Sequence, residues 1–235
     1  EKNFFLVCNY LVHKVNSLKV ITVSKKYKKK FDKSVVLITP SLNVWDNFNR
    51  KVKYLIALIL LIKEIIKNKN TIIFSFQANI YCILICKLFS IKVITRSNTA
   101  PAGWSKNPIK RLIFRIGLSL SDKVMVNSIQ FKKILKKDLN VNSECIYNPL
   151  NRKEIIKKSK KSSRKIFNSS RKLKILNIGR FTDQKDQLTF LKSLNQIKGK
   201  ISFEACLVGR GALKQKLEKY ILDNKLNHFV KILNF

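Results

Sequence analysis

Two short segments in the last third of the chain combine glycine with basic side chains in a pattern suited to binding phosphate. Glycine allows a sharp turn and lets a ligand approach the backbone closely. Arginine offers an anion a planar fork of N–H donors, and lysine offers a compact positive charge. Together they could hold the two phosphates of a diphosphate. The residues concerned are Gly179, Arg180, Lys185, Gly209, Arg210 and Gly211.

Each segment follows an apolar run typical of a buried strand and precedes a pattern typical of an amphipathic helix. The expected strands are Lys174–Ile178 and Phe203–Val208, and the second helix is expected from about Ala212. A parallel strand that feeds a helix brings the positive end of the helix dipole to the carboxyl edge of the sheet, where phosphates bind. Neither standard nucleotide fingerprint is met, because position 214 is lysine and no Gly-Lys-Ser/Thr triplet occurs. The residues alone leave open whether these are phosphate sites or plain turns.

Upstream of these segments, apolar strands also alternate with helical patterns, which predicts an α/β fold with parallel sheets and helices on both faces. Expected helices are 2–14, Arg50–Lys67, Asn79–Phe89, 108–119 and Ile129–Lys137. Expected strands are Lys19–Val23, Val35–Thr39, Thr71–Phe76, Lys92–Thr95, Lys123–Asn127 and Glu144–Tyr147.

Three stretches of this pattern resemble a known enzyme family. The C-terminal part, NIGRFTDQKDQLTFLKSL followed by LVGRGALKQKLEKYILDNKLNHFVKILNF, resembles the donor-binding half of the retaining glycosyltransferases of family 4. Upstream, KVMVNS and ECIYNPLN resemble the last strands of that family's first domain. The resemblance implies the GT-B type of α/β fold, with two Rossmann-like domains. It also places Gly179, Arg180, Lys185, Gly209 and Gly211 on the family's motif.

The resemblance divides the chain into three parts. Residues 1–150 are expected to form the N-terminal, acceptor-side domain without its first strand. Residues 173–235 are expected to be the first part of an incomplete, nucleotide-sugar-binding domain. Residues 151–172 read as a basic linker, because 151–174 carry eleven lysines and arginines against the single acid Glu154. Such a run repels itself and cannot bury a core, although it could contact lipid headgroups.

The activity that the resemblance implies is transfer of a sugar, with retention, from a nucleotide-diphosphate sugar to a glycan or lipid-linked acceptor. Negative charge would build on the departing diphosphate, and fixed cations would stabilise it. Arg180 and Lys185 are the expected catalytic cations. Gly179 and the turn of Gly209, Arg210 and Gly211 are expected to line the donor path. On the acceptor side, Arg96 and Asn98 occupy the matching positions after a strand, where a polar turn alone is the alternative.

Two acidic patterns are absent from this sequence, and only the absence of the second departs from the family. No Asp-x-Asp pair exists, so no metal and no other cofactor is expected. No two acids are eight positions apart, as the glutamates are that bind the donor's sugar and ribose in the family. We therefore expect a fragment, truncated at both ends and inactive by itself.

The net charge of +36 favours anionic partners and salt-dependent contacts. No nucleic-acid-binding module is recognisable, so nucleic acid is not the expected partner. An anionic membrane surface fits better, which together with the resemblance predicts a cytoplasmic protein, peripheral on the inner face of the membrane. The apolar run Tyr54–Ile62 is too short to span a bilayer and reads as a core helix, with a membrane-surface helix as the alternative. The five cysteines read as buried thiols.

Two other classes of protein stay open. The first is a non-catalytic nucleotide or anion binder of the same fold, because fold does not determine chemistry. The second is a basic nucleic-acid-binding protein, which would bind duplex DNA with a steep dependence on salt.

Overall fold

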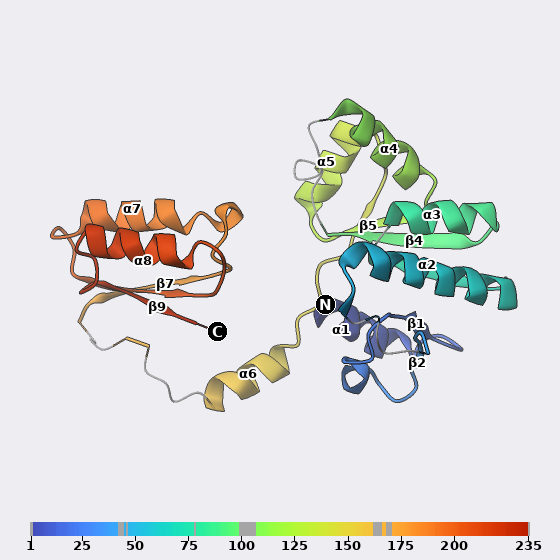
Figure 1. Cartoon of the computed structure of the whole chain (residues 1–235), viewed down its shortest axis with the longest axis horizontal. Coiled ribbons are helices and arrows are strands. Elements are labelled where there is room, and N and C mark those ends of the chain that lie inside the picture. The colour runs from blue at the N-terminus through green and yellow to red at the C-terminus, as the bar shows by residue number, and fades with distance from the viewer. Residues whose placement is uncertain are drawn as a thin grey trace. The chain divides into compact units, whose positions relative to one another are not determined.

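The structure, a computed structural model, describes residues 2–41, 45, 47–77, 79–98, 107–161, 166–167 and 171–234. The chain divides into two compact units, Glu1–Asn151 and Arg152–Phe235, and both are built from parallel strands that alternate with helices (Figure 1). Parts of the predicted linker, at 162–165 and 168–170, lie outside the described residues.

The first unit contains two parallel sheets in its described residues. The strands β3, β4, β5 and β6 pair in that order, and β1 pairs with β2 in a separate sheet. The strands are β1 (Lys19–Ile21), β2 (Val36–Ile38), β3 (Ile72–Ser75), β4 (Lys92–Ser97), β5 (Lys123–Val126) and β6 (Glu144–Cys145). The helices are α1 (Lys2–Leu11), the short 3-10 helix η1 (Lys28–Lys30), α2 (Arg50–Lys67), α3 (Asn79–Leu88), α4 (Pro108–Ser119) and α5 (Ile129–Leu139).

Helix starts in this unit follow from local capping chemistry. The side chain of Asn49 accepts a hydrogen bond from the Val52 N–H at the start of α2, and Ser128 does the same for the Phe131 N–H in α5. Asn107 caps α4 by accepting from the N–H of Ile109. Asparagine and serine satisfy otherwise unpaired N–H groups of a first helical turn. The predicted starts of these helices are therefore confirmed.

The main core of this unit lies between the four-stranded sheet and helices α2, α3 and α5. Ile65, Ile83, Val93, Val126 and Leu135 are completely buried in it. The run Tyr54–Ile62 lies in α2, which buries one stripe in this core but leaves a second apolar stripe exposed. The core-helix interpretation is therefore right for one face only. No helix in the described residues is long and apolar enough to cross a membrane.

Asp122 ties the start of β4 to the end of α3. Its Oδ2 accepts from the Val93 N–H at 2.7 Å and from Lys87 Nζ at 2.9 Å. The hydrogen bond from the Val93 N–H, followed by that from Lys87, lowers the pKa of the Asp122 carboxyl. A carboxyl with a depressed folded-state pKa stabilises the fold above its unfolded-state pKa, and this contribution is lost as the pH falls through the folded-state pKa.

We expect Asp122→Asn to lower the free energy of unfolding by about 1 kcal/mol at pH 7, because a charge-assisted bond becomes a neutral one beside a partly exposed ion pair. The difference from the wild type should shrink as the pH falls below about 4. Urea denaturation at pH 7 and pH 3 measures it. Asp223→Asn, at an exposed position of the second unit, removes the same charge and is the control. A pH-independent difference would contradict the prediction.

The second unit holds a three-stranded parallel sheet in the order β7-β8-β9. Its elements are α6 (Arg152–Lys161), β7 (Leu173–Ile178), the 3-10 helix η4 (Asp183–Lys185), α7 (Gln187–Ile197), β8 (Phe203–Val208), α8 (Lys214–Asp223) and β9 (Val230–Leu233). Both predicted strands and the helices after them are confirmed. Within the described part, α7 and α8 lie side by side over one face of the sheet (Figure 1). The opposite face leaves Leu176 and Ile178 of β7 exposed, which differs from the expected helices on both faces.

Helix α6 occupies the first half of the segment that was predicted to be a basic linker, where no helix was expected. Lysine favours helix about as well as glutamate does. An ion pair between Glu154 and Lys158, four residues apart, also supports the helix. Ile155 and Ile156 stay more than 40% exposed, so α6 is solvated although it is helical.

Candidate functional site

The two predicted turns lie against each other at the carboxyl edge of the second unit's sheet. Ile178 and Val208 are paired at the ends of β7 and β8, so the chain leaves both strands at the same level. The Gly179 N–H donates to the Val208 carbonyl at 3.0 Å, and the Phe181 N–H donates to the Arg210 carbonyl at 3.0 Å. The structure thus brings both predicted glycine-basic segments into one site.

Gly209 and Gly211 are required for this contact. A Cβ on Gly209 would lie 1.9 Å from the Gly179 carbonyl oxygen, and one on Gly211 would lie 2.3 Å from the Phe181 carbonyl oxygen. Gly179 differs, because its nearest neighbour would be the Gln187 side-chain nitrogen at 3.3 Å. The sequence suggested that glycine serves either the turn or the approach of a ligand. In the structure, these two glycines serve the packing of one turn on the other.

Lys185 and Arg180 lie at the same turn. Lys185 ends η4, and its Cγ and Cδ would lie 3.7 and 3.8 Å from a Cβ placed on Gly179, so its aliphatic stem covers that glycine. Arg180, Lys185 and Arg210 all expose their side chains. The ion pairs found among the described residues involve other cations. Three cations at this edge are therefore available to an anion.

The side chain of Gln187 supports the turn that contains Arg180. The sequence did not lead us to predict this role. The side chain is 1% exposed, and its Nε2 donates to the Arg180 carbonyl at 3.0 Å. Its Oε1, like the Thr182 hydroxyl, is buried without a hydrogen-bond partner in the described structure. A signal did exist, because Gln187 stands four residues before Leu191 on the buried stripe of α7. A polar residue at a core position often has a positioning task.

A carboxylate side chain caps the first turn of α7. Asp186 is the N-cap residue, in a left-handed conformation (φ 46°), and its side chain accepts from the Thr189 N–H at 3.3 Å. Asp186 also lines a hollow of about 170 Å³ with Asp183 and Lys216. Asp186 therefore pairs with one N–H group of this turn and places a negative charge there, which disfavours a phosphate at the N-terminus of α7. Helix α8, in contrast, has Leu213 as its N-cap residue and therefore no side-chain cap.

The prediction for Arg96 was wrong about where the strand that contains it ends. The predicted strand ended at Thr95, but β4 continues to Ser97 because its ladder with β5 extends through Arg96. The Arg96 side chain is 2% exposed, and its Nη2 donates to the Ile146 carbonyl and to Asn148 Oδ1, both at 3.0 Å. Burial lowers the pKa of its guanidinium. Arg96 thus holds the chain after β6 and does not stand in an exposed turn.

Asn98 is exposed just past the end of β4. The residues that follow it, 99–106, lie outside the described part of the chain. A second set of hydrogen bonds joins the ends of β3 and β4. Asn79 Nδ2 donates to the Arg96 carbonyl at 3.0 Å, and Ser75 Oγ donates to Asn79 Oδ1 at 2.9 Å. The sequence did not suggest these two residues.

Comparison by sequence finds no matching family model and no matching curated protein. Comparison of the structure with solved structures does find similar folds. Crystal structures of HepE from Anabaena match with a TM-score of 0.65 for the UDP complex, at 13% identity, over 99% of this chain and 65% of that one. The chain thus spans just under two thirds of the length of HepE.

Two further solved structures also match. The lipopolysaccharide outer core galactosyltransferase WaaB matches with a TM-score of 0.51 at 13% identity, over 88% of this chain and 56% of that one. TarM matches with a TM-score of 0.55 at 14% identity, over 76% of this chain and 36% of that one. These neighbours are GT-B glycosyltransferases. The predicted fold class is confirmed: the chain has the α/β architecture of GT-B proteins, with parallel, Rossmann-like sheets.

Proposed function

We propose that the chain is part of a retaining glycosyltransferase of family 4 that uses a nucleotide-diphosphate sugar as donor. The observation that carries the proposal is the contact between the two glycine-basic turns, which gathers Arg180, Lys185 and Arg210 at one sheet edge. Cations fixed beside a leaving diphosphate stabilise the charge that develops in the transition state. A single strand-turn-helix unit would supply fewer of these groups.

Each group has a distinct part in this proposal. Arg180 would hold the diphosphate through its fork of N–H donors, and Lys185 would act as a point charge on the same side. The turn at Gly209–Gly211 would line the donor path, with N–H groups of the uncapped α8 facing the same edge. Gln187 would position Arg180 through its hydrogen bond to the Arg180 carbonyl.

The neighbours' names support the substrate class. HepE was crystallised with UDP and with UDP-glucose, and WaaB is named a galactosyltransferase of the lipopolysaccharide outer core. We therefore propose a glycan or lipid-linked acceptor, reached at the cytoplasmic face of a membrane, for the synthesis of cell-envelope polysaccharide. We also propose that no metal takes part, because the sequence has no Asp-x-Asp pair. The chain alone should be inactive, since it lacks two acids at a separation of eight.

The test is calorimetric titration of the chain with UDP, UDP-glucose and UMP. UDP should bind at least about tenfold more tightly than UMP, because its second phosphate meets cations that a monophosphate does not fill. Equal affinity for UDP and UMP would contradict a diphosphate site. Duplex DNA that competes with UDP and binds with a steep salt slope would favour a nucleic-acid binder instead.

A further inference from the structure

Helix α4 of the first unit turns an apolar face toward solvent. Five large apolar side chains recur along it at separations of three, four, seven and eleven residues, which places them on one side of a helix. They are between 41% and 67% exposed. Gly117 and Leu118 are the buried residues of α4. The exposed residues are Ile109, Leu112, Ile113, Ile116 and Leu120.

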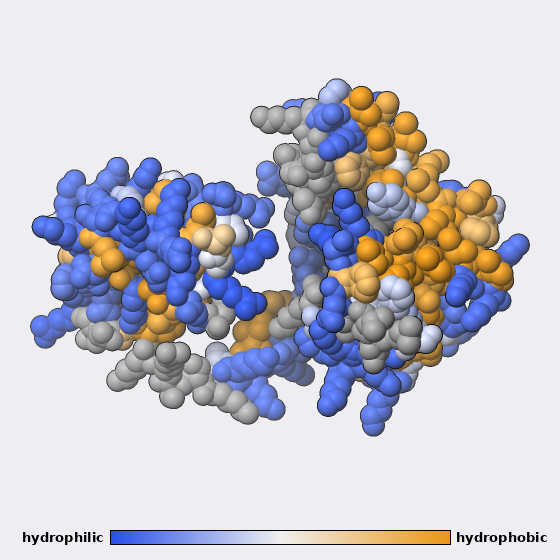
Figure 2. All heavy atoms as spheres, in the orientation of Figure 1, coloured by the Kyte–Doolittle hydropathy of each residue, from blue (hydrophilic) through white to orange (hydrophobic). Residues whose placement is uncertain are grey.

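This face continues over the neighbouring helices. Gly117 lets α4 lie closely on α3, because a Cβ there would come within 2.5 Å of the Ile80 side chain. Figure 2 shows the result as an orange area that runs from α4 over α3 to α2. A soluble monomer rarely exposes so extended an apolar patch unless something binds to it. The exposed large apolar residues of α3 and α2 are Tyr81, Leu84, Leu88, Leu55, Ile59 and Ile66.

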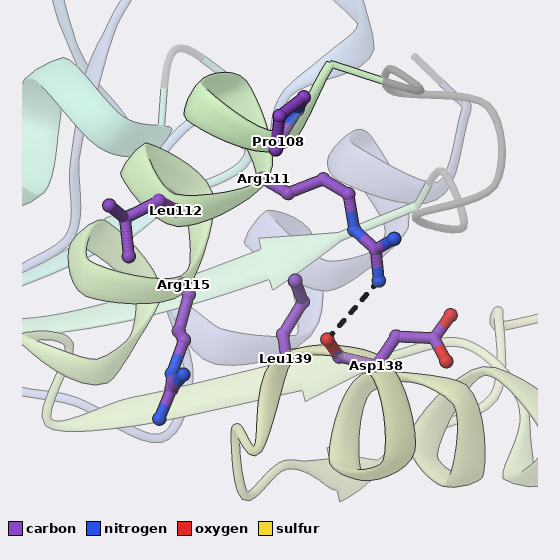
Figure 3. Close-up of a pocket in the computed structure, with 6 residues that line it drawn as sticks. All are labelled: Pro108, Arg111, Leu112, Arg115, Asp138 and Leu139. Carbon is purple, nitrogen blue, oxygen red and sulfur yellow. Dashed lines mark hydrogen bonds between the residues drawn. The ribbon is translucent and has the colours of Figure 1, made fainter.

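Basic side chains flank the apolar stripe of α4. Arg111 and Arg115 border it on one side and Lys110 on the other, and the helix contains no acid. The two arginines line a shallow hollow of about 270 Å³ between α4 and α5, with Leu112 beside them (Figure 3). Arg111 Nη2 donates to the Asp138 carbonyl at 3.4 Å, which directs its guanidinium into this hollow.

We propose that this face, the exposed apolar stripe of α4 with its flanking Lys110, Arg111 and Arg115, docks on an anionic lipid membrane. Leu112 and Ile116 enter the boundary between headgroups and acyl chains, and the two guanidinium groups meet lipid phosphates at the same depth. An apolar stripe bordered by cations is the arrangement by which helices lie on membranes without crossing them. Each basic residue near an anionic surface adds to the attraction.

Charge favours a lipid over a second copy of this chain. The net charge is +36, so two copies facing each other through α4 would bring like charges together. The same charge is complementary to an anionic bilayer. This inference differs from the sequence-based alternative of a membrane-surface helix at Tyr54–Ile62, since it places α4 at the centre and α2 at its margin. It does not depend on the proposed transferase reaction.

Co-sedimentation with phosphatidylcholine vesicles, with and without phosphatidylglycerol, tests the proposal without donor or acceptor. The chain should bind the anionic vesicles at least about tenfold more strongly than the neutral ones. Arg111→Gln combined with Arg115→Gln should weaken binding to anionic vesicles about 30-fold. Leu112→Ser combined with Ile116→Ser should weaken it at least tenfold, because buried apolar area is lost. Both pairs are at exposed positions, and circular dichroism should report an unchanged fold.

Matched variants elsewhere separate this face from bulk charge and hydrophobicity. Lys28→Gln with Lys29→Gln removes the same charge from exposed sites on η1, and Leu222→Ser with Ile201→Ser removes exposed apolar side chains from the second unit. Both of these double variants should bind vesicles nearly as strongly as the wild type does. Equal losses in these controls and in the α4 variants would overturn the proposal. So would a dimer, seen by analytical ultracentrifugation, that the Leu112 and Ile116 changes dissociate while vesicle binding stays the same.

Discussion

Replacing Gly209 by alanine should destabilise the second unit by about 3 kcal/mol or more, because the new methyl group meets a backbone atom that cannot move aside. Its Cβ would lie 1.9 Å from the Gly179 carbonyl oxygen. Relief requires the two turns to separate, which breaks the hydrogen bonds from Gly179 to Val208 and from Phe181 to Arg210. The unit's sheet would lose the contact that joins β7 and β8 beyond their ends.

Urea denaturation followed by far-ultraviolet circular dichroism measures this loss. Two glycines provide controls in the same unit. Gly179→Ala should cost less than Gly209→Ala, because its nearest contact, the buried Gln187 Nε2, lies at 3.3 Å and is not a backbone atom at 1.9 Å. Gly199→Ala meets nothing within 4 Å and carries only the strain of a positive φ of 84°, about 1 kcal/mol. A Gly209→Ala variant as stable as the Gly199→Ala variant would show that the turns do not touch in solution.

Arg180→Ala and Lys185→Ala should each weaken diphosphate binding by about 10²-fold and slow sugar transfer by the proposed transferase at least as much. Both side chains are exposed and no ion pair of the described residues uses them, so the free energy of unfolding should stay within about 0.5 kcal/mol of the wild type. Affinity for UDP and for UMP, measured side by side, reports the effect. The double variant should bind the two nucleotides equally.

Lys192→Ala is the matched control, because Lys192 is an exposed lysine on α7 away from the turns. It changes the net charge by the same amount as Lys185→Ala and should leave UDP affinity unchanged. If all three variants lose affinity equally, the interaction is a general attraction to a basic surface. If none does, the diphosphate site and the proposed transferase mechanism are both wrong.

The fold could be predicted from the sequence where local chemistry determines it. Asn49 and Ser128 precede apolar periodicity and place the starts of α2 and α5. Strand ends were less accurate, since pairing with β5 extends β4 through Arg96, which propensity cannot reveal. Helix α6 was not predicted, because the prediction considered the charge of this segment and left out the helix propensity of lysine.

The candidate site was predictable only in part. The two turns could be placed at one edge because parallel strands bring their carboxyl ends together. That Gly209 serves packing, that Asp186 caps α7 and that Gln187 holds the Arg180 carbonyl all depend on contacts between segments distant along the chain or on a single backbone conformation. Periodicity likewise identifies an apolar stripe on α4 but cannot tell whether it faces a core or solvent.

The interlocked turns have a thermodynamic consequence for any ligand that they bind. Because the Gly179 carbonyl abuts Gly209 and the Phe181 N–H is bound to the Arg210 carbonyl, neither loop can be displaced without the other. Their conformational entropy is lost once, when the unit folds, and not again at each binding event. Association with a diphosphate should therefore immobilise two or three long side chains rather than a loop, which leaves more of the electrostatic attraction as net affinity.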